Sequence, residues 1–125
     1  MAGERDSLTH DVIGAAIEVH REMGPGLLES IYQKCLEREL CLRKLSFEPQ
    51  LRVPLIYKGM PLEEPLVMDF YFPGRLVVEI KAVNQLLPIH DAQLVTYLRL
   101  SKTLVGLLIN FHVPVLKDGV KRLVH

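Results

Sequence analysis

The sequence predicts an α/β domain in which helices cover a mixed β-sheet. In the first third of the chain, apolar residues such as Val12, Ala16 and Val19 recur at helical spacing. After residue 44, apolar residues alternate with polar ones or form short continuous runs bounded by glycine and proline, which is typical of strands. A chain of 125 residues suffices for one hydrophobic core, so we expect a single domain over 1–125.

The composition excludes several classes of protein. The hydrophobic fraction of 49% fits a globular protein rather than a disordered one. Fifteen basic and 15 acidic residues cancel, which argues against a protein that holds nucleic acid by overall charge alone. The longest apolar runs, such as 104–109, are far shorter than the roughly 20 residues that span a bilayer. The N-terminal residues are polar and contain no signal-peptide segment, so we expect a cytoplasmic protein without a membrane partner.

Two helices are predicted at the N-terminus. Ser7 or Thr9 caps the first helix, and the run Gly24-Pro25-Gly26 ends it. The second helix is predicted over 27–44, and so short a connection favours an antiparallel helical hairpin. The residues expected on the buried side of the second helix are Leu28, Ile31, Cys35, Leu36 and Leu40.

The remaining elements are strands with one further helix. Pro49 and Pro54 lack the backbone N–H that a central strand needs, so the strand at 47–55 is predicted to lie at an edge of the sheet or to contain a bulge. Lys58-Gly59 marks a turn after it. The later elements are predicted as strands at 66–72 and 76–83, a helix at 88–102 that begins with a proline, and strands at 104–111 and 120–124.

Two charged residues lie on the apolar strand at 76–83. Side chains two apart on a strand share a face, so Glu79 and Lys81 point the same way. Charges in the interior of a sheet are costly unless they are paired or bound to something. The alternative is a solvated surface pair, which contributes about 0–1 kcal/mol.

A third charged residue, Asp69, favours a functional site. It lies on the preceding strand, and a hairpin about Pro73 and Gly74 places it opposite Val78 and beside Glu79, within reach of a shared ion after a one-residue adjustment of the register. Two carboxylates brought close together repel each other, and a divalent cation relieves the repulsion. Lys81 would then hold the attacking water or stabilise charge on a phosphate.

The pattern Asp69, Glu79-x-Lys81 resembles the active-site motif of the PD-(D/E)XK nuclease superfamily. A closer resemblance is to its GxxExxY group, whose naming motif corresponds to 26–32, and Gln93 to Tyr97 is similar to the Q-x-x-x-Y element of RecB-type nucleases. The resemblance covers nearly the whole chain and implies a restriction-endonuclease-like fold, with the N-terminal helical hairpin placed before it. One departure is Met68, which stands where the superfamily name has a proline.

The resemblance also implies roles for residues. Asp69 and Glu79, with Glu29 assisting, match the acids that bind Mg²⁺ or Mn²⁺, and Lys81 matches the catalytic lysine. Glu29 could instead be an ordinary exposed helix residue. The residues expected to bind substrate or to support the site are Gln93, Tyr97, Tyr32 and His90. The alternatives are that Tyr97 belongs to the core, that Gln93 is a surface residue and that His90 lies at a helix end without a catalytic role.

Two functions follow from these residues and their resemblance. The first is a metal-dependent nuclease that hydrolyses phosphodiester bonds in DNA, with RNA as the other substrate. The second is a catalytically silent module of the same fold that binds a protein or nucleic-acid partner, and a homodimer would enlarge the small surface available for binding. A small-molecule enzyme on another α/β fold finds no support, because no phosphate-binding glycine loop or nucleophile elbow is present.

Overall fold

The computed structural model describes residues 2–125, apart from the side chains of residues 2–6 and 65. Its elements follow the predicted order, and most boundaries agree within a few residues. The elements are α1 (Ala2–Met23), α2 (Glu29–Leu42), β1 (Glu48–Tyr57), β2 (Met60–Phe72), β3 (Leu76–Lys81), α3 (Pro88–Ser101), β4 (Val105–Asn110), the short 3-10 helix η1 (Leu116–Gly119) and β5 (Val120–Val124). Two boundaries differ clearly, because α1 begins before the predicted caps and β2 begins before residue 66.

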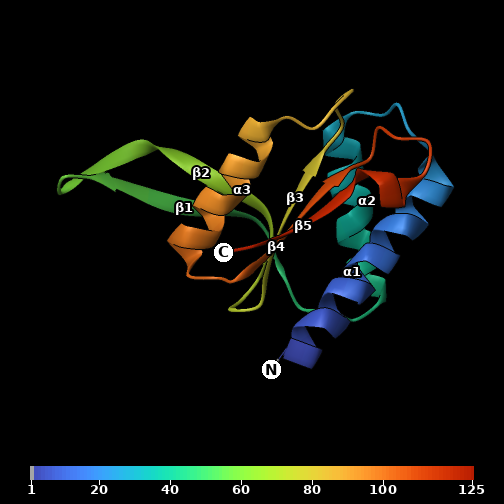
Figure 1. Ribbon diagram of the computed structural model, residues 1–125, viewed down its shortest axis with the longest axis horizontal. Helices are drawn as coiled ribbons and strands as arrows, with labels where there is room; N and C mark the ends of the chain where they lie inside the picture. Colours follow the sequence, from blue (N-terminus) through green and yellow to red (C-terminus); the bar gives the residue numbers. More distant parts are fainter. Residues whose placement is uncertain (1) are drawn as a thin grey trace.

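The five strands form one mixed sheet in the order β1-β2-β3-β4-β5. The pair β3–β4 is parallel and the other neighbouring pairs are antiparallel. In Figure 1, α3 lies on one side of the strands, and α1 and α2 lie on the other. The predicted fold class of a mixed sheet flanked by helices is therefore confirmed, as is the edge position of β1.

The larger part of the core lies between the sheet and the helical hairpin. From β3, Leu76, Val78 and Ile80 point to this side. The buried residues of α2 are Tyr32, Gln33, Leu36 and Leu40. The prediction that Leu28 and Ile31 are buried is wrong: α2 begins at Glu29, so Leu28 precedes the helix and is 70% exposed. The buried side of α2 is thus rotated toward Tyr32 and Gln33.

The opposite face of the sheet is covered by α3. Leu94, Tyr97 and Leu98 of this helix are buried against Val77 of β3 and Leu108 of β4. Because Val77 faces α3, Glu79 and Lys81 on the same strand also point toward the α3 side. Glu79 and Lys81 therefore lie on the face of the sheet that a single helix, α3, covers (Figure 1).

The turn between α1 and α2 is held by Tyr32. Gly24 and Gly26 adopt φ angles of 71° and 96°, which glycine reaches without strain. The Tyr32 hydroxyl donates to the Gly24 carbonyl and accepts a hydrogen bond from the Leu27 N–H. Its ring is fully buried and stacks on Phe111, with ring centroids 4.5 Å apart. These contacts fix the angle at which α2 enters the fold.

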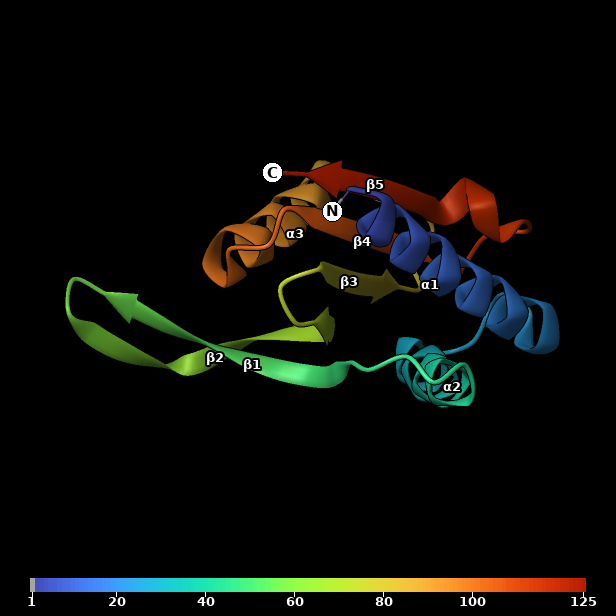
Figure 2. The same cartoon turned by 90° about the horizontal axis from the view of Figure 1, so that it is seen from below.

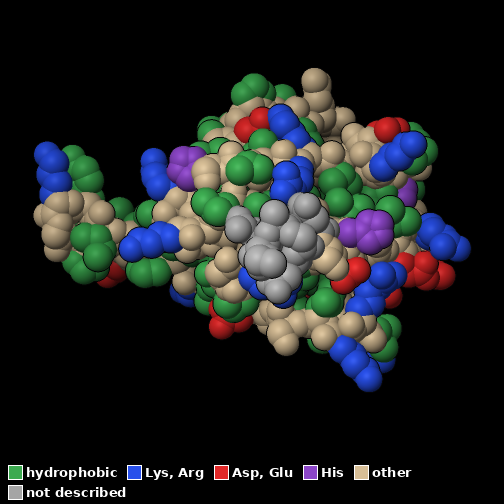
Figure 3. All heavy atoms as spheres, turned by 60° about the horizontal axis from the view of Figure 1, so that its bottom comes forward, with side chains coloured by type: hydrophobic (Ala, Val, Ile, Leu, Met, Phe, Trp, Pro, Cys, Tyr) green, Lys and Arg blue, Asp and Glu red, His purple; other side chains and the backbone are tan. Residues whose placement is uncertain are grey.

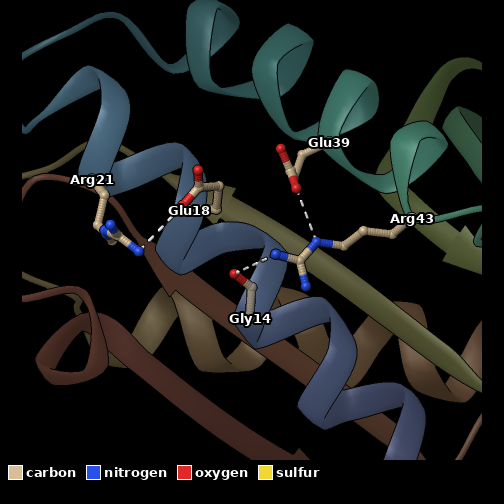
Figure 4. A network of polar contacts seen from close by, with 5 residues as sticks. All are labelled: Gly14, Glu18, Arg21, Glu39 and Arg43. Atoms are coloured by element: carbon tan, nitrogen blue, oxygen red, sulfur yellow. Dashed lines mark hydrogen bonds and ion pairs between the residues drawn. The ribbon is translucent and has the colours of Figure 1, made fainter.

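A polar contact also links the end of α2 to α1 at the surface (Figure 4). Arg43 donates to Glu39 on its own helix at 2.9 Å and reaches the Gly14 carbonyl of α1 at 3.4 Å. On α1, Arg21 pairs with Glu18 at 3.5 Å. Exposed pairs of this kind contribute about 0–1 kcal/mol each, so the apolar layer beneath them supplies most of the association between the helices.

The β1–β2 hairpin extends away from the rest of the fold (Figures 1 and 2). We call its outer part, residues 55–64, the arm. Lys58 and Gly59 form the tight turn at its tip with φ angles of 47° and 84°, as the sequence predicts. The register of the pair is irregular between Val53 and Leu55, where Pro54 cannot donate to the ladder.

None of the described helices is both long enough and apolar enough to cross a lipid bilayer.

Candidate metal centre

The strands β2 and β3 separate at the position of Asp69. Their last paired residues are Phe70 and Val78. Beyond this pair, hydrogen bonds from the backbone to side-chain carboxyl groups replace those between the two backbones. Glu79 Oε1 accepts a hydrogen bond from the Asp69 N–H at 3.0 Å. Asp69 Oδ2 in turn accepts one from the Ile80 N–H at 2.9 Å. The two acids therefore lie next to each other, each held by the backbone of the opposite strand.

The predicted register of this hairpin is wrong by one residue. Asp69 was expected opposite Val78, but Val78 pairs with Phe70. The reason is the turn: Phe72 pairs with Leu76, and Arg75 belongs to the turn, where its N–H donates to the Phe72 carbonyl at 2.8 Å. The shift brings Asp69 level with Glu79.

The environment of Glu79 makes its ionisation unfavourable. Its side chain is only 5% exposed. Burial, with the negative charge of Asp69 beside it, raises the pKa of Glu79 to about 9. The protonated carboxyl hydrogen-bonds to the Asp69 side chain and still accepts from the Asp69 N–H. In the metal-free protein, Glu79 therefore carries a proton at neutral pH.

Lys81 supplies a positive charge next to the acids. Its ammonium donates to Gln93 Oε1 of α3 at 3.4 Å, and its backbone carbonyl accepts from the Phe111 N–H at 2.9 Å. The charge of Lys81 lowers the pKa of Glu79 in opposition to the larger effect of burial. The contact with α3 holds the side chain on the Glu79 side of β3.

Glu29 approaches the site from α2. It is the first residue of that helix and lines a cavity of about 380 Å³ together with Asp69. Partial burial, followed by the charge of Asp69, raises the pKa of Glu29, whereas Lys81 lowers it. The structure thus brings Glu29, Asp69, Glu79 and Lys81 into one region, from α2, β2 and β3.

Gln93 and Tyr97 border the site from α3. Gln93 is exposed, yet its side-chain oxygen accepts the hydrogen bond from Lys81. Tyr97 is 9% exposed. Burial, and then the charges of Glu79 and Asp69, raise the pKa of the Tyr97 hydroxyl. Tyr97 is therefore both part of the core and a neighbour of the acid pair.

Tyr32 and His90 lie in other surroundings. The contacts of Tyr32 are those of the α1–α2 turn described above. His90 Nδ1 accepts a hydrogen bond from the Leu87 N–H at 2.9 Å, across the first turn of α3. The described contacts of Tyr32 and His90 stabilise the beginnings of α2 and α3, so neither side chain is part of the acid site.

Two residues next to Asp69, Gln33 and Gln50, were not among the site residues predicted from the sequence. Gln33 lies one helical turn after Glu29 on α2, and this spacing was a signal that could have indicated it. Gln50 on β1 has a φ of 48° and donates from Nε2 to Asp69 Oδ1 at 3.0 Å. The conformation of Gln50 depends on contacts between strands and has no signal in the local sequence.

The acid pair fits a hydrated divalent ion. Mg²⁺ retains several waters and is held by one or two carboxylates, and the carboxyl groups of Asp69 and Glu79 lie next to each other. Among the side chains that the structure describes, no group of three or more His, Cys, Asp or Glu residues is gathered closely enough to enclose an ion.

Comparison with known proteins identifies the family of the chain. A model of the PD-(D/E)XK nuclease superfamily matches residues 6–123. The search of curated proteins and the search of solved structures each returned no match. Nucleases of this superfamily generally use divalent metal ions. With the mixed sheet and flanking helices described above, the match over nearly the whole chain shows that this protein belongs to the PD-(D/E)XK nuclease superfamily.

Proposed function

We propose that the protein is a Mg²⁺- or Mn²⁺-dependent nuclease that hydrolyses phosphodiester bonds in DNA, or in RNA. The observation that carries this proposal is the meeting of Asp69 and Glu79 where β2 and β3 separate, with Lys81 on the same strand as Glu79. The motif at 26–32 supports a place within the superfamily in the GxxExxY group, and Gln93 with Tyr97 supports a RecB-like nuclease, as one nuclease-like domain over 1–125.

The residues have distinct roles in this proposal. Asp69 and Glu79 bind the ion, and Glu79 loses its proton when it does so, because a ligating carboxyl must be ionised. A bound divalent ion polarises the scissile phosphate and lowers the pKa of a water ligand. Lys81, held by Gln93, stabilises negative charge that develops on the phosphate.

Local basic residues would compensate for the zero net charge. A second cavity, of about 610 Å³, is lined by Lys34 and Arg38 of α2, and Lys34 also lines the cavity that contains Asp69. A nucleic-acid backbone that passes from the acid pair along α2 would meet both charges. Binding that depends on such contacts weakens steeply as salt is added.

Cleavage assays test the proposal. Single-stranded DNA, duplex DNA and RNA are incubated separately with the protein and Mn²⁺ or Mg²⁺, and each reaction is repeated with excess chelator. We expect cleavage of at least one substrate that the chelator abolishes. Cleavage that is insensitive to the chelator would contradict a metal-dependent mechanism. Metal binding without cleavage of any substrate would favour the module described next.

The arm favours a second candidate, a module that binds a second copy of the chain. Its large apolar side chains are exposed, with Ile56 at 69%, Tyr57 at 60% and Met60 at 57%. Figure 3 shows hydrophobic side chains, with Lys and Arg beside them, where the hairpin leaves the body. On α1, Ile17 at 38% and Met23 at 43% are less exposed than these three residues of the arm. Exposed apolar surface of this kind often marks an interface.

Replacing Tyr57 with lysine tests the arm as a dimer contact. A charge at the centre of an apolar interface opposes association, so we expect a wild-type dimer to become a monomer. The molar mass in solution, measured by light scattering during gel filtration, reports this change. Ile17→Lys on α1 serves as the control and should keep the wild-type mass. An unchanged mass for Tyr57→Lys would remove the arm from the interface.

A further inference from the structure

Two glutamine side chains contact Asp69 from different elements. Gln33 of α2 donates from Nε2 to the Asp69 carbonyl at 3.1 Å and to Glu37 Oε2 at 2.9 Å. Gln50 of β1 donates from Nε2 to Asp69 Oδ1 at 3.0 Å. Both side chains line the cavity of about 380 Å³ that also contains Glu29 and Asp69. The two amides therefore hold Asp69 by its backbone and by its carboxylate.

The side chain of Gln33 has a defined orientation that leaves one atom without a partner. Its two partners, a carboxylate and a carbonyl, accept hydrogen bonds, so the amide nitrogen must face them. Gln33 is only 8% exposed, and its Oε1 is buried and receives no hydrogen bond from any residue that the structure describes. A buried acceptor without a donor is unfavourable, so this orientation of Gln33 is maintained by the two hydrogen bonds that its Nε2 donates.

Gln50 is held in a strained backbone conformation. A φ of 48° is in the left-handed region, which a residue with a β-carbon rarely adopts within a strand. The β1–β2 register pairs Pro49 with Phe70 and Leu51 with Met68, and it omits Gln50 and Asp69 between them. Both ladders of β2 are thus interrupted at Asp69, by Gln50 on one side and by Glu79 on the other. Such a conformation persists only where the surrounding structure holds it, and here the Gln50 amide donates to the Asp69 carboxylate.

We propose that Gln33 and Gln50 are positioning residues of the metal centre, which hold Asp69 by its backbone carbonyl and by its carboxylate. This inference rests on the proposed function, because it requires a divalent ion at Asp69. Gln50 and the Ile80 N–H each occupy one lone pair of the Asp69 carboxylate, which leaves the others for the ion.

The strain at Gln50 allows its role in metal binding to be separated from a role in folding. Gln50→Gly removes the amide and tolerates the left-handed backbone, so the metal-free protein should melt at the wild-type temperature or above it. Residues that orient metal ligands typically contribute a factor of about 10 to 100 to metal affinity. A residue with only a structural role would instead lower the melting temperature and leave the affinity unchanged.

Calorimetric titration of Mn²⁺ into the full-length protein tests the proposal, together with melting curves recorded in chelator. We expect Gln50→Gly and Gln33→Met each to weaken Mn²⁺ binding by about 10- to 100-fold. Gln85→Gly, which changes an exposed glutamine outside the cavity, should bind like the wild type. If Gln50→Gly does not fold, Gln50→Asn replaces it, since asparagine tolerates a positive φ but its amide is one methylene shorter.

The possible outcomes distinguish this inference from the proposed function. Wild-type affinity in the Gln33 and Gln50 variants would overturn the positioning roles and leave the metal centre intact. A wild-type protein that does not bind Mn²⁺ would overturn both. Weaker binding in both variants, with a melting temperature of Gln50→Gly at or above that of the wild type, would support the inference.

Discussion

Replacing Glu79 with glutamine is expected to raise the free energy of unfolding of the metal-free protein by about 3 kcal/mol at pH 7. The folded-state pKa of Glu79 is about 9 and its ordinary value is 4.5, so between these values the native state keeps a proton that the unfolded state releases. The stability associated with protonated Glu79 is therefore complete below pH 4.5 and is lost as the pH rises toward 9. Glutamine is always neutral and avoids this loss.

Urea denaturation in the presence of a chelator measures this effect. Wild-type stability should fall between pH 5 and pH 8 by about 1.4 kcal/mol for each pH unit relative to Glu79→Gln. Glu63→Gln, which changes an exposed acid on the arm, is the control and should follow the wild type. A Glu79→Gln protein that is less stable than the wild type at pH 8 would show that Glu79 is ionised in the native state.

Replacing Lys81 with methionine is expected to reduce metal-dependent cleavage by about 10²- to 10³-fold. Methionine keeps most of the apolar stem but removes the charge that would act on the phosphate in the transition state. The substitution also removes the hydrogen bond from Lys81 Nζ to Gln93, which is long at 3.4 Å and exposed, so the fold should persist. The rate of cleavage under single-turnover conditions measures the reduction.

Two further measurements make the Lys81 result specific. Lys102→Met, at the exposed end of α3, should keep wild-type activity, and the melting temperature of Lys81→Met should stay close to that of the wild type. Full activity in Lys81→Met would indicate that the cleavage arises at another site or from another protein.

Much of the fold could be predicted from the sequence because its strands have clear boundaries. Gly59 and Gly74 mark turns, and the apolar run of β3 indicates a central strand, which the structure confirms. The two prolines of β1 indicate an edge strand, and Pro54 lies at the register irregularity. These features depend on local backbone chemistry, which follows from the residue types alone.

The features that were not predicted depend on contacts between elements. The register at Asp69 follows from the inclusion of Arg75 in a turn, which a hairpin centred on Pro73 and Gly74 does not reveal. The left-handed backbone of Gln50 occurs beside Asp69, where the hydrogen-bond ladders of β2 with β1 and with β3 are both interrupted. Tyr32 was expected near the site because it follows Glu29 by three residues, but stacking on Phe111 turns it into the core.

The most direct test of the metal centre is calorimetric titration of Mn²⁺ into the wild-type protein at pH 6 and at pH 8. Because the ion must displace the proton of Glu79, whose pKa is about 9, affinity should increase about tenfold per pH unit, or about 100-fold across this range. Titrations in buffers of different ionisation enthalpy should show about one proton released per ion. No binding at either pH, or equal affinity at both, would contradict an ion held by Asp69 and Glu79.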